Sequence, residues 1–378
     1  MSFCFEVLKT DPTGARCGRL RTPHGVVETP VFLPVGTAAT VKGLRQEALE
    51  ELGASLILAN TYHLYLRPGH ERVRGLGGLH RFMSWRGAIL TDSGGYQVFS
   101  LADLRKVTDE GVRFRSHLDG SEHLLTPEKA VEIQLALGSD ISMALDECIR
   151  TPAPRAAAES AVKRTTGWAR RSQNYFQECA RRNGEPAQVQ FGIVQGATFA
   201  DLRRVSTRQL LDIGFPGYAI GGLAVGEPHA MTCEMTGEVT ALLPQDRPRY
   251  LMGVGRPEQL ADYAALGVDL MDCVLPTRAA RHACLYTSEG RLLIKNARYA
   301  DDQRPVDGHC SCSVCARYSR AYLRHLFAAG ELLAAVLATH HNVHFYLDLM
   351  RQIRETIGFG KLASFSSEMH MRYAEGPA

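Results

Sequence analysis

The sequence has no long apolar segment. Among its 378 residues, no uninterrupted apolar run approaches the roughly 20 residues that a membrane-spanning helix requires. The first residues, Met1 to Glu6, lack the basic start and the apolar stretch of a secretory signal peptide. We therefore exclude a membrane protein and predict a soluble protein of the cytoplasm.

The cysteines lack the regular spacing of a disulfide framework. Ten cysteines are unevenly spaced, and Cys310, Cys312 and Cys315 fall within six positions. Such a close group favours a metal site in a reducing compartment over disulfide bonds. The composition is otherwise ordinary, with 45% hydrophobic and 22% charged residues, which is enough for one large core.

The chain also has little net charge, at +3, but this charge is unevenly distributed. Between Leu275 and His325 there are nine lysines or arginines and four acidic residues. Because this basic segment follows directly after Asp272, with a basic turn at its start, we predict a surface that binds a polyanion beside a carboxylate pocket. A solvated basic surface without a ligand is the alternative.

Eight short apolar runs bounded by turn residues predict eight β-strands. Helical start and stop signals separate most of them; Thr126-Pro127-Glu128, for example, begins a segment that stops at Gly138. Eight alternating units predict a parallel sheet closed into a (β/α)8, or TIM, barrel of the α/β class. The expected strands are Val31–Val35, Ser55–Asn60, Ala88–Asp92, Ile141–Asp146, Val189–Gln195, Tyr218–Leu223, Tyr250–Val254 and Val268–Asp272.

Several of these strands end in polar residues or glycines. In a TIM barrel, the C-terminal ends of the strands face the active site. We therefore expect one pocket that contains Asp92, Asp146, Gln195, Gly221, Gly222 and Asp272.

Asp92 and Asp272 would bring two carboxylates to this pocket. Paired carboxylates can act as nucleophile and as acid or base at a glycosidic carbon. Gly94 and Gly95 follow Asp92 and allow the backbone to approach a ligand, and Tyr96 supplies a flat aromatic face. By itself, without the other pocket residues, this stretch would be better explained as a tight turn with a packed tyrosine.

Asp146 and Gln195 point to a different role. A carboxylate accepts hydrogen bonds, whereas an amide and the backbone N–H groups of Gly221 or Gly222 can donate them. Guanine presents the complementary pattern, with N1–H and an amine as donors and O6 as acceptor. For Gln195 alone, a strand-end hydrogen bond is an equally good explanation.

The chain is longer than the roughly 250 residues of a bare barrel, so we expect additional units. An N-terminal hairpin region, 1–30, precedes a catalytic barrel, 31–275, with an insertion at about 93–125 that contains a hairpin around Asp119-Gly120. A C-terminal region, 276–378, contains a second hairpin around Ser288-Glu289-Gly290 and a zinc-binding helical subdomain.

The cysteine group offers three thiolates for a tetrahedral zinc site. His341 can complete it, and His309, His325, His340 and His344 compete as the fourth ligand on spacing alone. Four protein ligands leave no open coordination position, so the zinc would be structural and would hold the basic hairpin region against the following helices.

Together, several motifs resemble the bacterial tRNA-guanine transglycosylases. The resemblance extends from Gly36 or earlier to at least Tyr346, and the motifs occur in the family's order. They are Asp92-Ser93-Gly94-Gly95-Tyr96-Gln97, Asp146-Glu147-Cys148, Phe191-Gly192-Ile193-Val194-Gln195-Gly196, Gly221-Gly222-Leu223-Ala224-Val225-Gly226-Glu227, Tyr250-Leu251-Met252-Gly253-Val254-Gly255, Asp272-Cys273-Val274-Leu275-Pro276-Thr277-Arg278 and Cys-x-Cys-x-x-Cys.

This resemblance implies a base exchange in queuosine biosynthesis. Guanine at the wobble position of tRNAs with GUN anticodons, those for aspartate, asparagine, histidine and tyrosine, would be replaced by the small base preQ1. Asp272 would attack C1′ of the ribose to form a covalent intermediate, and Asp92 would be the general base for the incoming base. The family also implies a homodimer and, because its histidine ligand precedes an asparagine, His341 as the ligand of the Zn²⁺ ion.

The resemblance further implies two sets of binding residues. Those implied for the base are Ser93, Gly94, Gly95, Tyr96, Asp146, Gln195, Gly221, Gly222, Leu223 and Met252. Those implied for the anticodon loop are Gly253, Val254, Gly255, Arg256, Pro257, Glu258, Gln259, Thr277, Arg278, Ala279, Ala280 and Arg281.

Two positions indicate the subtype, and two alternatives compete with it. Cys148 and Val225 resemble the bacterial, preQ1-using pattern, whereas Arg281-His282-Ala283 departs from the Arg-Asn-Gly of many relatives. A non-catalytic RNA-binding subunit of the same family is disfavoured because Asp92 and Asp272 are both present. A metal-dependent barrel hydrolase would need metal ligands on the barrel strands.

Overall fold

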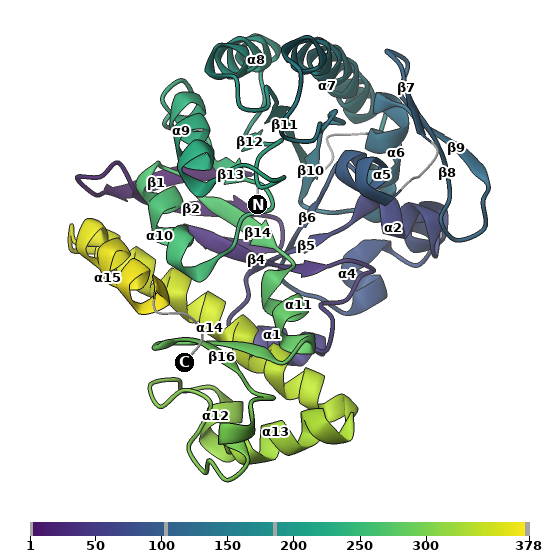
Figure 1. Ribbon diagram of the computed structural model, residues 1–378. Coiled ribbons are helices and arrows are strands. Elements are labelled where there is room, and N and C mark those ends of the chain that lie inside the picture. The colour runs from purple at the N-terminus through teal and green to yellow at the C-terminus, as the bar shows by residue number, and fades with distance from the viewer. Residues whose placement is uncertain (1–2, 102–104, 184–186, 375–378) are drawn as a thin grey trace.

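The predicted barrel is confirmed in the computed structural model, which describes residues 3–101, 105–183 and 187–374. Eight parallel strands close into a ring, because β14 pairs with β4 as well as with β13 (Figure 1). In chain order these strands are β4 (Val31–Gly36), β5 (Leu56–Ala59), β6 (Ala88–Thr91), β10 (Ile141–Met143), β11 (Val189–Val194), β12 (Tyr218–Ile220), β13 (Arg249–Leu251) and β14 (Leu270–Cys273).

Helices follow the strands and surround the ring. Thr126 caps the first turn of α6 by accepting from the backbone N–H of Lys129, and Gly138 ends this helix with a φ of 70°, as its sequence predicts. The helices between strands β4 and β14 are α1 (Gln46–Glu51), α2 (Thr61–Leu66), α3 (His70–Gly75), α4 (Gly78–Met83), α5 (Gly95–Leu101), α6 (Pro127–Leu137), α7 (Arg155–Asn183), α8 (Ala200–Ile213), α9 (His229–Thr240) and α10 (Pro257–Ala265).

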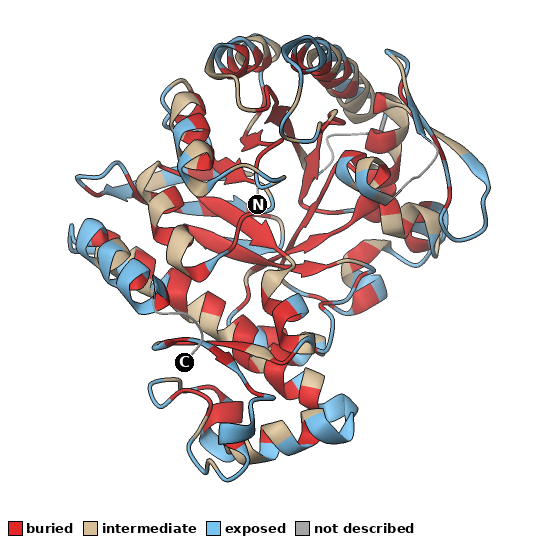
Figure 2. Cartoon of the chain, viewed as in Figure 1, coloured by how far each residue is buried: buried red, intermediate tan, exposed pale blue. Residues whose placement is uncertain are grey.

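The N-terminal segment forms a three-stranded sheet instead of a simple hairpin, with β1 (Cys4–Thr10), β2 (Arg16–Thr22) and β3 (Gly25–Thr29). Its Phe5, Leu20 and Val27 pack in one buried cluster with the barrel interior, which is the buried centre of Figure 2. A buried ion pair joins this sheet to the barrel, because Arg16 Nε donates to Asp269 Oδ1 at 2.9 Å.

The insertion also forms a three-stranded sheet. The expected hairpin consists of β8 (Val112–Arg115) and β9 (Glu122–Leu125), and β7 (Arg105–Val107) adds a third strand that the sequence did not reveal. Residues 102–104 of this predicted insertion lie outside the described residues, as do 1–2 and 375–378 of the predicted terminal regions.

The segment after the last barrel strand contains, among the described residues, the second expected hairpin, five α-helices and one short 3-10 helix. The hairpin is followed by helices, of which the longest, α14, contacts α11 and β4. In order, the elements are α11 (Leu275–Arg281), β15 (Cys284–Thr287), β16 (Gly290–Leu293), the 3-10 helix η1 (Ala297–Tyr299), α12 (Ser313–Arg317), α13 (Arg320–Ala329), α14 (Leu332–Gly358) and α15 (Leu362–Ala374).

One local prediction is wrong. The segment after Asp272, expected as a basic turn, is the helix α11. Pro276 fits its first turn, where no N–H is needed, and Ala279 and Ala280 have high helix propensity. None of the described helices is long and apolar enough to cross a membrane.

Candidate active site and metal centre

Asp272 lies on β14 and is buried at 9% exposure. The Tyr250 hydroxyl donates to its Oδ1 at 2.6 Å, and the backbone N–H of Gly253 donates to the same oxygen at 2.9 Å. Burial raises the pKa of this carboxyl, although both hydrogen bonds act in the opposite direction. Because both donors from the described residues bind Oδ1, Oδ2 is the oxygen available to a substrate.

Asp92 follows β6 and is held in a similar way. Asn60 Nδ2 donates to its Oδ2 at 2.5 Å, and the backbone N–H of Thr61 donates to its Oδ1 at 2.8 Å. Burial and, to a smaller extent, the charge of Asp272 raise the pKa of Asp92 to about 6, although the hydrogen bonds from Asn60 and Thr61 act in the opposite direction. The two carboxylates are thus close enough to interact, and a pKa near neutrality suits a group that exchanges protons.

Asp146, after β10, connects three barrel strands through its side chain. Ser93 Oγ donates to its Oδ1 and Gln195 Nε2 donates to its Oδ2, both at 2.7 Å. Gln195 Oε1 is buried and has no hydrogen-bond partner among the described residues. A buried acceptor without a partner costs free energy, so this oxygen marks a place where a ligand can donate.

A larger side chain does not fit at Gly222, next to the Gln195 amide. The φ of Gly222 is +65°, and a Cβ there would lie 2.2 Å from Gln195 Oε1. The buried Arg203 supports the same backbone, since its guanidinium donates to the Gly221 carbonyl at 3.1 Å and to the Gly222 carbonyl at 3.3 Å. Burial lowers the pKa of Arg203 to about 10.

The remaining predicted base contacts lie on the segments that follow β6, β12 and β13. Tyr96, in the first turn of α5, is 48% exposed, so its ring is accessible. Met252 is half-buried and Leu223 is buried. The pocket residues expected from the strand ends therefore occupy one end of the barrel.

The predicted anticodon-loop residues occupy the same end, after β13 and β14. Arg256 and Arg278 are exposed. Val254, Thr277 and Ala280 are buried, so their side chains pack in the protein interior and do not belong to the surface of these segments.

Sequence reasoning missed the residues that hold the carboxylates. Asn60, Thr61 and Tyr250 are the hydrogen-bond donors of Asp92 and Asp272, and Arg203 is a buried cation beside the Gly221-Gly222 backbone. Asn60 could have been identified from the sequence, because it is the polar last residue of an expected strand. Tyr250 and Arg203 give no such signal, because their partners depend on how neighbouring strands and helices are placed.

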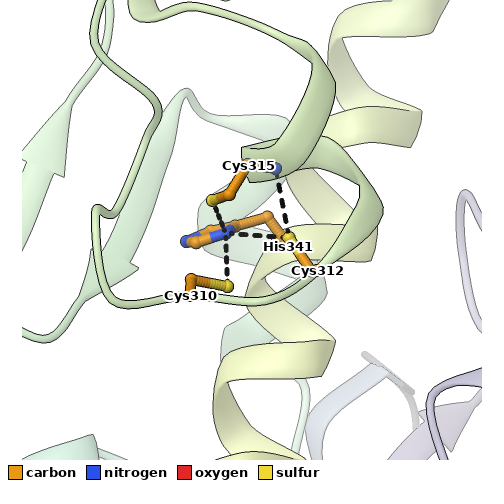
Figure 3. A group of neighbouring side chains, drawn as sticks. All are labelled: Cys310, Cys312, Cys315 and His341. Atoms are coloured by element: carbon orange, nitrogen blue, oxygen red, sulfur yellow. Dashed lines mark hydrogen bonds between the residues drawn. The ribbon is translucent and has the colours of Figure 1, made fainter.

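The three cysteines and His341 converge at the other candidate site (Figure 3). His341 Nδ1 lies 3.8, 3.6 and 3.3 Å from the sulfurs of Cys310, Cys312 and Cys315, respectively. Contacts from Cys310 and Cys315 lower the pKa of the Cys312 thiol. Three thiols and an imidazole nitrogen with this convergence can hold a metal ion, and the set fits zinc.

A second contact fixes the histidine. His341 Nε2 lies 2.7 Å from the carbonyl oxygen of Tyr286, which orients the ring as outer partners of metal-binding histidines do. Of the competing ligands, His340 Nε2 contacts Ser313 Oγ at 3.1 Å, and His344 Nδ1 contacts Cys310 Sγ at 3.4 Å. His341 alone among the three reaches all three sulfurs.

The next residue, Asn342, ties this centre to the barrel end. Its Nδ2 donates to the carbonyls of Pro276 and Cys284, both at 3.0 Å, and its Oδ1 accepts from the backbone N–H of Tyr286 at 3.0 Å. The helix that carries His341 therefore also holds the chain just after Asp272.

Comparison with known proteins agrees with this arrangement. A family model described as Queuine tRNA-ribosyltransferase matches residues 11–375. A queuine tRNA-ribosyltransferase of Koribacter versatilis is 58% identical over 367 residues, which cover 96% of this chain and 95% of the relative. Relatives of the same name from Desulforudis audaxviator and Symbiobacterium thermophilum are 57% and 52% identical, over 97% and 100% of this chain and 98% and 93% of the relatives.

Proposed function

This chain belongs to the queuine tRNA-ribosyltransferase family, and on that premise we propose that it is a transferase that exchanges guanine in tRNA for another base in queuosine synthesis. The observation that carries the proposal is the pair of buried carboxylates, Asp92 and Asp272, whose charges interact within one barrel end. Each is held by two hydrogen bonds, so both are oriented before a substrate binds.

Asp272 is the nucleophile of the first step. Its Oδ2 forms a bond to C1′ of the ribose, and the bond between C1′ and the guanine nitrogen breaks, with its electron pair leaving on guanine. Tyr250 and Gly253 keep the carboxylate in position through Oδ1. The product of this step is a covalent ester between the tRNA and the enzyme.

Asp92 is the base of the second step. It takes a proton from the ring nitrogen of the incoming base, and that nitrogen attacks C1′ while the ester bond to Asp272 breaks. Two displacements at one carbon retain its configuration. The wobble nucleotide has to leave its stack to reach these carboxylates, as in other enzymes that act on bases.

Asp146, Gln195 and the backbone at Gly221 and Gly222 bind the purine edge, while Tyr96 and Met252 cover its faces. The free acceptor Gln195 Oε1 and the accepting carboxylate of Asp146 suit a ligand edge rich in donors. Ser93, Gly94, Gly95 and Leu223 complete this binding site.

The incoming base is preQ1, and the substrates are tRNAs with GUN anticodons. Val225 and the buried Cys148 support the preQ1 assignment, since they match the bacterial pattern. The exposed Arg256 and Arg278 contact the anticodon loop among the predicted residues 253–259 and 277–281.

The Cys310, Cys312, Cys315 and His341 group holds one structural Zn²⁺ that supports the C-terminal region.

The chain consists of three units, which are the N-terminal region 1–30, the barrel 31–275 and the region 276–378. The enzyme works as a homodimer in the cytoplasm. A metal-dependent hydrolase is disfavoured because the cysteine group lies outside the barrel strands.

The decisive experiment is exchange of radiolabelled guanine into unmodified tRNA with a GUN anticodon, with and without preQ1. Incorporation that preQ1 suppresses supports both the reaction and the preQ1 subtype. Incorporation that preQ1 does not suppress would refute the subtype. No incorporation by folded, zinc-containing protein would favour a non-catalytic RNA-binding subunit.

A further inference from the structure

A second group of metal-binding side chains lies on three helices outside the barrel. His229 is the first residue of α9, Asp262 belongs to α10 and His370 to α15. His229 Nε2 and His370 Nε2 each lie 2.8 Å from Asp262 Oδ2. We call these three residues, together with Cys233, the α9–α15 cluster. None of the four residues belongs to the proposed active site or to the cysteine group.

Cys233 offers a fourth donor only after a side-chain rotation, because the ligand atoms that all lie within 4.8 Å of one another are those of His229, Asp262 and His370. Cys233 lies one turn after His229 on α9, so both side chains share one face of the helix, and its sulfur is 3.5 Å from His229 Nε2. Ligands of a tetrahedral Zn²⁺ with bonds of about 2.0 to 2.3 Å are separated by about 3.3 to 3.7 Å. The nitrogens and the carboxylate oxygen need to separate by about half an ångström to admit the ion, which rotamer adjustments can provide.

Outer contacts orient the donors as they do at metal sites. The Tyr263 hydroxyl lies 3.1 Å from His229 Nδ1, and Ser366 Oγ donates to Asp262 Oδ1 at 2.5 Å. Burial opposes ionisation of Asp262, but hydrogen bonds from His229, Ser366 and His370 lower its pKa, so the carboxylate is charged. The side chains of His229, Asp262 and His370 are 26%, 22% and 44% exposed, so an ion from solvent can reach them.

A second group of two histidines and one carboxylate has an arrangement that does not suit a metal ion. His24 and His80 also share a carboxylate, that of Asp140, but their rings stack with centroids 3.5 Å apart and planes 14° apart. They contact different oxygens of Asp140, whose Oδ2 also accepts from the backbone N–H of Ile89. Stacked rings direct their nitrogens side by side and not toward one point, so this group is a set of hydrogen bonds.

We propose that the α9–α15 cluster is a second metal site, distinct from the cysteine group, that binds Zn²⁺ and fastens the C-terminal helix α15 to the barrel helices α9 and α10. On binding, each histidine moves its Nε2 proton to Nδ1 or to solvent, and the Cys233 thiol releases its proton to solvent. The ion takes the place of these protons, so binding weakens as the pH falls.

Metal titration of the full-length protein tests the site. The zinc content of the purified protein is measured first, and Co²⁺ is then added at increasing concentration. We expect one further equivalent in the wild-type protein, a higher Tm when Zn²⁺ replaces Co²⁺ in this titration, and neither effect in His370→Gln. The matched control is His24→Gln, which alters the stacked histidine pair and should bind the additional equivalent normally.

The ligand set has its own test. Because the cysteine group keeps its zinc during the titration, a thiolate-to-cobalt absorption band would come from Cys233. Cys233→Ser should bind Co²⁺ more weakly and without this band, and Tyr263→Phe should bind it about tenfold more weakly.

Three outcomes would overturn the proposal. One is the absence of a further equivalent in the wild-type protein, and another is equal binding by the wild type and His370→Gln. The third is loss of binding in His24→Gln as well as in His370→Gln. Failure of guanine exchange would leave this result untouched, because the titration measures bound metal and not turnover.

Discussion

The barrel end and the cysteine group both bury reactive polar side chains, but they stabilise them differently. Asp92 and Asp272 receive their hydrogen bonds from the protein, through Asn60, Thr61 and Tyr250. The three thiols instead surround one nitrogen of His341, a donor set in which a metal ion can balance the charge of the thiolates. The carboxylate site is therefore preorganised by the fold, whereas we propose that the cysteine group depends on an ion.

Asp272→Asn should abolish catalysis at the barrel end and leave the cysteine group unchanged, which is the largest expected difference between the two sites. The amide keeps the shape of the side chain but removes the nucleophile, so guanine exchange should fall by about 10⁴-fold or more. The covalent band between enzyme and tRNA on denaturing gels should disappear, while zinc content and Tm remain those of the wild type. A covalent band that persists would refute the assignment of Asp272.

Cys312→Ala should produce the converse result. Loss of the metal is among the changes that destabilise proteins by more than about 4 kcal/mol, and here it should act on the region around α12 to α14. Zinc analysis should lose one equivalent and tRNA affinity should fall, with binding of free guanine nearly unchanged. If guanine affinity falls as much as tRNA affinity, the two sites are not independent.

Tyr250→Phe tests whether the fold orients the nucleophile. A hydrogen bond to a charged group contributes about 1.5 to 3 kcal/mol, so kcat should fall about ten- to a hundredfold. KM for tRNA should change little, since the hydroxyl contacts Asp272 and not the anticodon loop. Tyr218→Phe, which removes another buried barrel hydroxyl, is the matched control and should keep kcat.

The pH dependence of kcat/KM reports on Asp92. Its raised pKa of about 6 means that the carboxyl takes up a proton as the pH falls through 6. A protonated Asp92 is no base, so activity should fall about tenfold for each further pH unit. A profile that stays flat down to pH 5 would contradict the role of Asp92.

Arg278→Ala should have the smallest effect. It removes one exposed charge from the α11 surface, so binding of different GUN tRNAs should weaken about equally. The slope of log affinity against log salt should decrease by about 1. A slope identical to that of the wild type would exclude a phosphate contact by this residue.

The features predictable from the sequence are those that depend on local pattern. The barrel follows from eight apolar runs, and the contacts of Asp146 with Ser93 and Gln195 follow because parallel strands end at the same edge of the sheet. The helix α11 was missed because basic residues and a proline suggested a turn, although two alanines favour a helix.

Contacts between distant residues were not predictable in this way. The pairing of Tyr250 with Asp272 depends on strand register, and His370 meets Asp262 only because α15 packs on α10. Propensity and spacing contain no information on such packing. The anchors of a site are therefore harder to predict than its reactive groups.

Asn342 has a practical consequence for anyone who measures this enzyme. It follows the proposed metal ligand His341 and donates to the Pro276 carbonyl, four residues after the proposed nucleophile Asp272. A preparation that has lost part of its zinc to a chelating buffer should then contain molecules whose nucleophile is poorly placed. Such a mixture would show a low specific activity with a normal KM, so metal content should be assayed in every batch before rates are compared.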